Sequence, residues 1–173
     1  MQIKCKIDKQ NIIDFNIHQY KSSETMQKRV MISKLIGPMI FFFGMFIATW
    51  VTDIPFWYWA VAFVTTSLVW YWVYPKCLEM NIRKNVEKML AEGDNKVILE
   101  ESIITLDEHG ISKVNYYKES SLKWSSINKI NLTNDYIFIY DSAMSAIIIP
   151  RDIFLKNEDE QEFINTLNKY FNK

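Results

Sequence analysis

Between Leu35 and Tyr74 the only formally charged residue is Asp53. Asp53 divides this segment into apolar runs of 18 residues (35–52) and 21 residues (54–74). As helices these runs would reach roughly 27 and 31 Å, and the hydrocarbon core of a bilayer is about 30 Å thick. Two buried helices of a soluble core would need more surrounding protein than a chain of 173 residues provides. The segment 35–74 therefore predicts a two-helix transmembrane hairpin.

Basic residues flank this hairpin on both sides and are absent from its turn (52–55). Four lie before it and four after it, within roughly 20 positions of its ends: Lys21, Lys28, Arg29 and Lys34, then Lys76, Arg83, Lys84 and Lys88. Positively charged flanks stay in the cytoplasm. We therefore expect a multi-pass protein of the cell membrane with both termini cytoplasmic and the turn outside.

Small residues recur along both apolar runs. The first run has Gly37, Gly44 and Ala48, and the second has Ala60 and Ser67. Small residues at helical spacing allow close packing of membrane helices. The pattern leaves open whether the helices pack within one chain or between chains.

The flanking segments have regular patterns of their own. In segment 1–34, Ile3, Cys5 and Ile7 alternate with charged residues, which predicts a strand. Asp8 then caps an amphipathic helix that runs toward the membrane through Val30. Segment 75–95 predicts a juxtamembrane helix and a linker at Gly93.

Segment 96–173 predicts a small antiparallel β domain closed by a helix. Short runs rich in Ile, Val and Tyr alternate with turn clusters, and the expected strands are 97–99, 102–107, 111–117, 121–125, 127–132, 136–140 and 146–149. An amphipathic helix follows at about 158–171. The expected fold class is thus an α+β membrane protein.

Two motifs in this domain carry a family resemblance: Trp124-x-x-Ile127, and Ile149-Pro150-Arg151 followed by Phe154. With the apolar run 136–140 and the order of elements over nearly the whole chain, they resemble the YcxB-like family of bacterial membrane proteins. The resemblance implies that the C-terminal domain is similar to a pleckstrin-homology-like domain. It implies no catalytic residues.

The sequence has little that would support catalysis. Its four glycines form no phosphate-binding loop or nucleophile elbow. His18 and His109 lack the spacing of a metal site, and a net charge of zero argues against a nucleic-acid partner. We therefore expect no enzymatic activity, cofactor, metal or nucleic acid.

Four residues of the β domain are candidates for contact with lipid or a partner. Lys113, Lys118 and Lys123 could meet anionic lipid if they lie on one side of the sheet. Trp124 could anchor a ligand. The alternatives are lysines that are merely solvated and a tryptophan that belongs to the core.

Two function classes follow from this organisation. The first is a membrane-tethered binding or interaction module at the inner face of the bacterial cytoplasmic membrane. The second is an accessory subunit of a membrane transport or stress-resistance assembly. The expected partners are the lipid bilayer and either a protein partner or a second copy of the chain bound through the hairpin.

Overall fold

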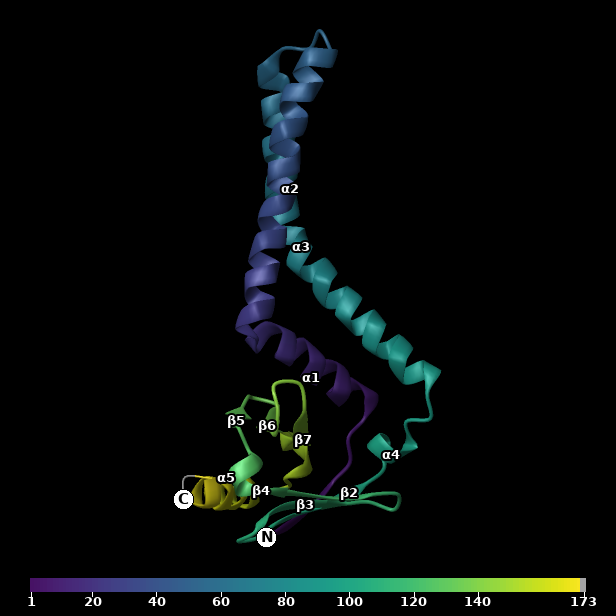
Figure 1. Ribbon diagram of the computed structural model, residues 1–173, viewed down its shortest axis with the longest axis vertical. Helices are drawn as coiled ribbons and strands as arrows, with labels where there is room; N and C mark the ends of the chain where they lie inside the picture. Colours follow the sequence, from purple (N-terminus) through teal and green to yellow (C-terminus); the bar gives the residue numbers. More distant parts are fainter. Residues whose placement is uncertain (172–173) are drawn as a thin grey trace. The chain divides into compact units, whose positions relative to one another are not determined.

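The computed structural model describes residues 1–171. It combines helices in the N-terminal part with antiparallel sheets, which confirms the mixed α+β class (Figure 1). The elements in chain order are β1 (Gln2–Cys5), α1 (Lys9–Ser22), α2 (Glu24–Val51), α3 (Phe56–Glu92), α4 (Lys96–Leu99), β2 (Ser102–Leu106), β3 (Gly110–Val114), β4 (Glu119–Lys123), the 3₁₀ turn η1 (Trp124–Ser126), β5 (Lys129–Leu132), β6 (Tyr136–Tyr140), β7 (Ala146–Pro150), the 3₁₀ turn η2 (Arg151–Ile153) and α5 (Asn157–Phe171).

The chain forms two compact units. We call residues 1–15 and 87–171 the sheet unit, and residues 16–86 the hairpin unit. The division between them passes through α1 and α3. Each unit therefore has its own packing.

The sheet unit contains two antiparallel sheets. One has the strand order β1-β2-β3-β4 and the other β5-β6-β7. Ile3 of β1 lies opposite Ile104 of β2, and Cys5 lies opposite Ser102. The first strand thus completes a sheet whose other three strands follow the hairpin in sequence.

The core of the sheet unit lies around β6. Ile137 and Ile139 are fully buried on one face of this strand, and Phe138 and Tyr140 are buried on the other. Phe15 of α1 covers the second face, with its ring centroid 5.5 Å from that of Phe138. Because both faces are covered, β6 is apolar throughout rather than alternating.

Helix α5 closes the same core. Its apolar stripe buries Phe163, Ile164 and Leu167, as the helical spacing of these residues predicts. Acidic residues fill its first turn, where the helix dipole favours negative charge.

Three local predictions were wrong. Residues 97–99 are helical, because both edges of β2 are already occupied by β1 and β3 and no edge there is free for another strand. The N-terminal helix does not continue through Val30 but ends at Ser22, and Ser23 caps α2 by accepting a hydrogen bond from the Met26 amide. Residues 124–125 form a 3₁₀ turn and not the end of a strand.

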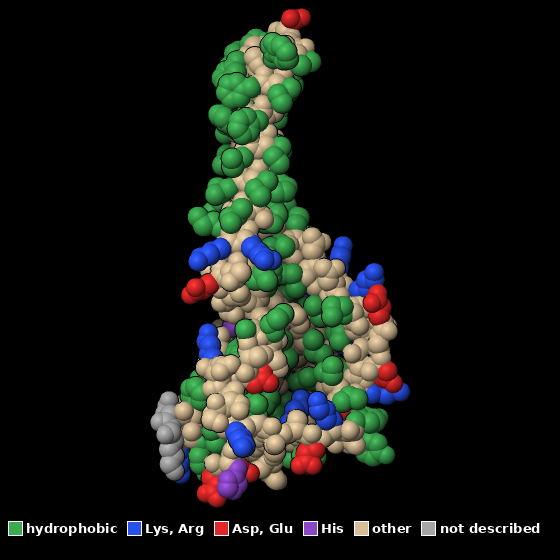
Figure 2. Space-filling view, viewed as in Figure 1, with side chains coloured by type: hydrophobic (Ala, Val, Ile, Leu, Met, Phe, Trp, Pro, Cys, Tyr) green, Lys and Arg blue, Asp and Glu red, His purple; other side chains and the backbone are tan. Residues whose placement is uncertain are grey.

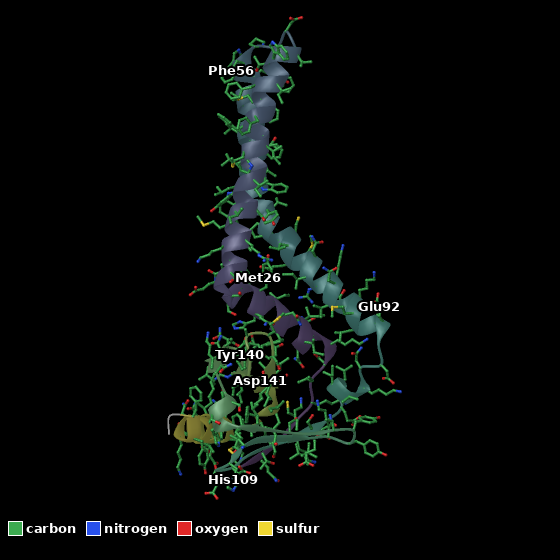
Figure 3. The ribbon with its side chains drawn as sticks, in the orientation of Figure 1. Met26, Phe56, Glu92, His109, Tyr140 and Asp141 are labelled. Atoms are coloured by element: carbon green, nitrogen blue, oxygen red, sulfur yellow. The ribbon has the colours of Figure 1, made fainter. Side chains whose placement is uncertain are left out.

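The hairpin unit consists of the end of α1, α2 and the first part of α3. Phe41 of α2 contacts Phe63 and Trp70 of α3, with ring centroids 6.4 Å apart in each case, and Figure 1 shows the two helices side by side along this stretch. Hydrophobic side chains cover their outer surface (Figure 2). Between the labelled Met26 and Phe56, side chains project away from the helix pair on both sides of the view in Figure 3.

Within residues 1–171, α2 is the one helix that is long and apolar enough to cross a membrane by length and composition. Only 11% of its most apolar window is buried. A core helix of a soluble protein would be mostly buried, so the exposure of α2 sets it apart from that class.

Candidate functional site

The three candidate lysines do not share one face of the sheet. Lys113 lies opposite Ile104, on the core side of the sheet, whereas Lys123 lies opposite Gly110, on the other side. Lys118 lies in the turn between β3 and β4. Burial lowers the pKa of the half-buried Lys113 amine. Contact of all three lysines with a lipid surface would require them to lie on one side of the sheet, and they do not. Lipid contact by these lysines stays a prediction.

Trp124 is a packing residue in η1. Its indole Nε1 donates to the Asp107 carbonyl oxygen at 2.9 Å, and its ring stacks on Tyr170 of α5 at 5.3 Å between centroids. The hydrogen bond joins η1 to the turn after β2, and the ring contact joins η1 to the C-terminal helix. They support the core alternative for Trp124.

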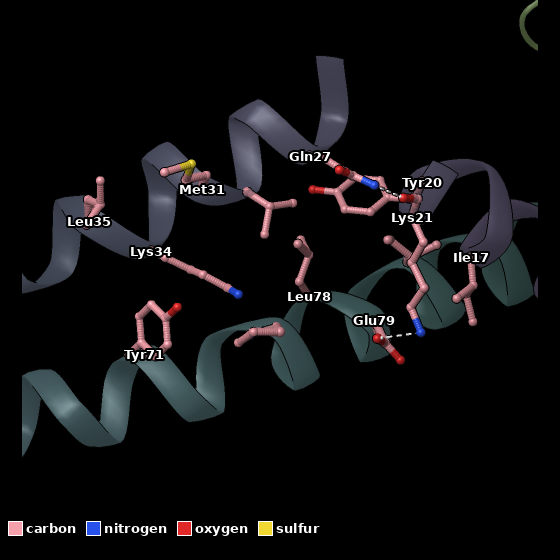
Figure 4. A pocket seen from close by; sticks show the side chains of 13 residues that line it. Ile17, Tyr20, Lys21, Gln27, Met31, Lys34, Leu35, Tyr71, Leu78 and Glu79 are labelled. Atoms are coloured by element: carbon pink, nitrogen blue, oxygen red, sulfur yellow. Dashed lines mark hydrogen bonds and ion pairs between the residues drawn. The ribbon is translucent and has the colours of Figure 1, made fainter. Parts of the chain in front are cut away.

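A hollow of the hairpin unit lies between α1, α2 and α3. It begins where α3 bends away from α2 (Figure 1), at the level of Pro75, which cannot donate the helical hydrogen bond to the Tyr71 carbonyl. The resulting cavity has a volume of about 540 Å³. Ile17, Val30 and Leu78 are among its apolar walls (Figure 4).

Charged side chains line the same cavity, which we call the hairpin cavity. The Lys21 ammonium pairs with the Glu79 carboxylate at 2.8 Å, and Figure 4 shows this pair on one side of the cavity. The Lys34 ammonium lies 5.1 Å from the centroid of the Tyr71 ring. Burial raises the pKa of the Tyr20 hydroxyl, which also lines the cavity.

Two polar clusters of the sheet unit serve packing. The Tyr136 hydroxyl donates to Asp14 at 2.8 Å and accepts from Asn11 at 3.3 Å, and burial raises its pKa to about 12. Arg151 forms an ion pair with Glu160. In the described part of the chain, no group of three or more His, Cys, Asp or Glu side chains is placed to hold a metal ion.

The comparison with protein families assigns the C-terminal part of the chain. Residues 106–167 match one family model. The matching family is the YcxB-like proteins. This confirms the predicted resemblance over a YcxB-like segment from the end of β2 to α5, whereas the sequence analysis extended it over nearly the whole chain. No curated protein and no solved structure gives a significant match.

The motifs of the YcxB-like segment have structural roles. Ile127 donates its amide hydrogen to the Trp124 carbonyl oxygen and is buried. Arg151 joins η2 to α5, and Phe154 contacts Phe163 of α5 at 5.5 Å between centroids. The residues that carry the resemblance therefore fasten the helix to the sheets.

The sequence analysis missed the hairpin cavity. The feature of the sequence that could have indicated it is Pro75, which lies where the apolar part of a helix continues into a polar part. Lys34 and Tyr71 lie on different helices, so their contact depends on how α2 and α3 pair.

Proposed function

We propose that this chain is a membrane-tethered, non-enzymatic interaction module. In this proposal α2 and the apolar half of α3 cross the bacterial cytoplasmic membrane as a hairpin, and the sheet unit lies in the cytoplasm. One observation carries the proposal: large apolar side chains are exposed along both helices, with Phe43, Ile47 and Val64 each about 60% exposed. Such a surface is stable in lipid and is rarely exposed to water.

The composition of α3 is consistent with a second span. Its apolar half includes seven Trp and Tyr residues at the turn or near the inner flank: Trp57, Tyr58, Trp59, Trp70, Tyr71, Trp72 and Tyr74. These side chains lower the mean hydropathy of the helix, yet they favour the interfaces of a bilayer. The absence of formal charge from residues 54–74 supports the same reading.

A second observation favours an interaction role for the sheet unit. Ile103 and Val114 lie opposite each other on the face of the first sheet that points away from the core, and both are exposed. The exposed Tyr116 follows them in the next turn. Exposed apolar groups of this kind are typical of binding surfaces. The four-stranded and three-stranded sheets with a terminal helix also support a pleckstrin-homology-like domain.

The accessory-subunit alternative has less support. It needs the small-residue face of the hairpin for packing against other membrane proteins, but Gly37 already lies against Trp70 of the same chain. The intramolecular use of this face favours the tethered module.

Cysteine labelling in intact cells tests the topology. Cys5 is 2% exposed and would resist reagents on either side of a membrane, so the test uses Cys77 and an Asp53→Cys variant in a Cys5→Ser background. A membrane-impermeant maleimide should label position 53 in intact cells and Cys77 only after permeabilisation. Labelling of Cys77 in intact cells would reverse the orientation, and release of the chain by carbonate washing would refute membrane insertion.

A further inference from the structure

The hairpin cavity has the size and lining of a ligand site. Its volume of about 540 Å³ lies within the range of about 300–1,000 Å³ for small-molecule sites. Most of the wall is apolar, with Ile17, Val30, Met31, Leu35, Leu78 and Ile82 contributed by three helices. A ligand that fills it must present hydrocarbon to most of this surface.

The charges of the cavity do not balance. Two lysines and one glutamate line it, and the glutamate, Glu79, is paired with Lys21. Lys34 is half-buried, and among residues 1–171 no carboxylate lies within ion-pair distance of its ammonium group. A contact with the Tyr71 ring leaves ammonium N–H donors available for an anion. The cavity therefore favours a ligand with one negative charge near Lys34.

The position of the cavity along the helices indicates the source of such a ligand. Leu35 and Tyr71 belong to the apolar runs, whereas Lys21 and Glu79 belong to the polar flanks. The cavity thus crosses the level at which the apolar surface of the hairpin ends. Figure 2 shows Lys and Arg side chains at this same level.

We propose that the hairpin cavity binds an anionic phospholipid. Its phosphate pairs with Lys34, and its acyl chains pack against the part of the apolar wall that Leu35 and Tyr71 form within the apolar runs, on the membrane side of the cavity. Free phosphate would leave that wall without a partner, and a neutral lipid would leave Lys34 without a counter-ion. The inference rests on the proposed function, because the membrane supplies the lipid.

The test measures lipid retention by the full-length chain in detergent. The protein is incubated with equimolar phosphatidylglycerol and phosphatidylcholine, and bound lipid is counted by native mass spectrometry. Wild type should retain phosphatidylglycerol selectively. Lys34→Gln should lower that retention about fivefold, since one lysine near an anionic group contributes on the order of 1 kcal/mol, and Lys34→Arg should restore it.

Two matched variants separate the cavity from general surface charge. Lys28→Gln removes an exposed lysine of α2 that does not line the cavity, and it should leave retention unchanged. Leu78→Trp should lower retention of the lipid, because the larger side chain occupies part of the cavity. A monodisperse peak in size-exclusion chromatography checks that this variant is folded. Equal retention of the two lipids by wild type, or equal losses in Lys34→Gln and Lys28→Gln, would overturn the proposal.

A failure of the proposed membrane tethering would be detected by a different measurement from a failure of the lipid site. It would appear as a chain that is washed from membranes by carbonate. Lipid retention in detergent does not depend on that fractionation, so a tethered chain without lipid selectivity would refute the cavity site alone.

Discussion

Of the two glycines in the hairpin unit, Gly37 has less room for a side chain. A Cβ atom added there would overlap the indole of Trp70, whereas one added at Gly44 would lie 3.5 Å from Phe63, in ordinary contact. The two glycines look alike in the sequence, and only the partner across the helix pair distinguishes them. Gly37 thus permits the close approach of α2 and α3.

We expect Gly37→Ala to destabilise the hairpin by about 1–3 kcal/mol through overpacking. Gly44→Ala should be neutral or slightly stabilising, because alanine favours the helix by about 1 kcal/mol. The two variants are compared by thermal unfolding of the full chain in detergent, monitored by circular dichroism. Adding Trp70→Phe to Gly37→Ala should recover part of the loss, and equal effects of the two glycine substitutions would contradict the packing.

Cys5 is a protected thiol of the sheet unit. Burial raises its pKa to about 11, and its Sγ atom lies 3.7 Å from the Ile148 carbonyl oxygen of the other sheet. In an unfolded chain a thiol has a pKa of about 8.5. The folded state therefore favours the neutral thiol, and the free energy of unfolding should fall as the pH rises from about 8.5 toward 11.

At pH 8 we expect a thiol reagent to modify Cys77 and leave Cys5 unmodified until the chain is unfolded. The reason is that the thiolate is the reactive form and Cys5 is both buried and neutral. The number of reactive thiols is measured from the absorbance of the chromophore that the reagent releases on reaction. In a Cys77→Ser variant no thiol should react in the native state, and a fast reaction there would show that Cys5 is exposed.

Among the elements, α5 is joined to η2 by an ion pair in addition to its apolar contacts. Arg151 of η2 pairs with Glu160 and donates to the Thr133 carbonyl oxygen at 2.7 Å. The side chains of the pair are only 29% and 12% exposed. Loss of either partner would leave the other partly buried without its counter-ion.

We expect Glu160→Gln to weaken docking of α5 by about 2 kcal/mol, a typical value for a hydrogen bond to a charged group. Amides of α5 in the full chain should then exchange about 30-fold faster in hydrogen exchange followed by mass spectrometry. Glu162→Gln changes an exposed side chain of the same helix and serves as the control. Equal exchange in both variants would show that the ion pair does not hold the helix.

At the scale of the whole molecule, the sheet unit is assembled from both ends of the chain. β1 forms one edge of the first sheet, and Phe15 covers β6. Both precede the hairpin, whereas the rest of the unit follows it. A fragment that begins after the hairpin would expose a sheet edge and a large part of the core.

We therefore expect residues 87–173 alone to be unstable or aggregated. Residues 1–15 joined to 87–173 through a long Gly/Ser linker should fold into a soluble, mainly β protein. Circular dichroism and size-exclusion chromatography distinguish the two. Phe15→Asp in the joined protein should abolish folding, since it places a charge in the core, and a stably folded 87–173 fragment would contradict this dependence.

Local patterns in the sequence determined much of this protein. The uncharged runs of the hairpin, the alternation of most strands and the apolar stripe of α5 each depend on residues near one another, and periodicity reports these directly. The strand β6 and the start of α5 were predicted within a residue. The motifs around Trp124 and Arg151 also indicated the YcxB-like family correctly for residues 106–167.

Only the tertiary structure decided the contacts between distant segments. The register of β3 and β4 places Lys113 and Lys123 on opposite faces, because a shift of one residue turns every side chain of a strand over. The pairing of β1 with β2 and the contact of Lys34 with Tyr71 likewise depend on competition among possible partners. A periodic pattern states which face a residue occupies on its own element, but it does not state what that face will meet.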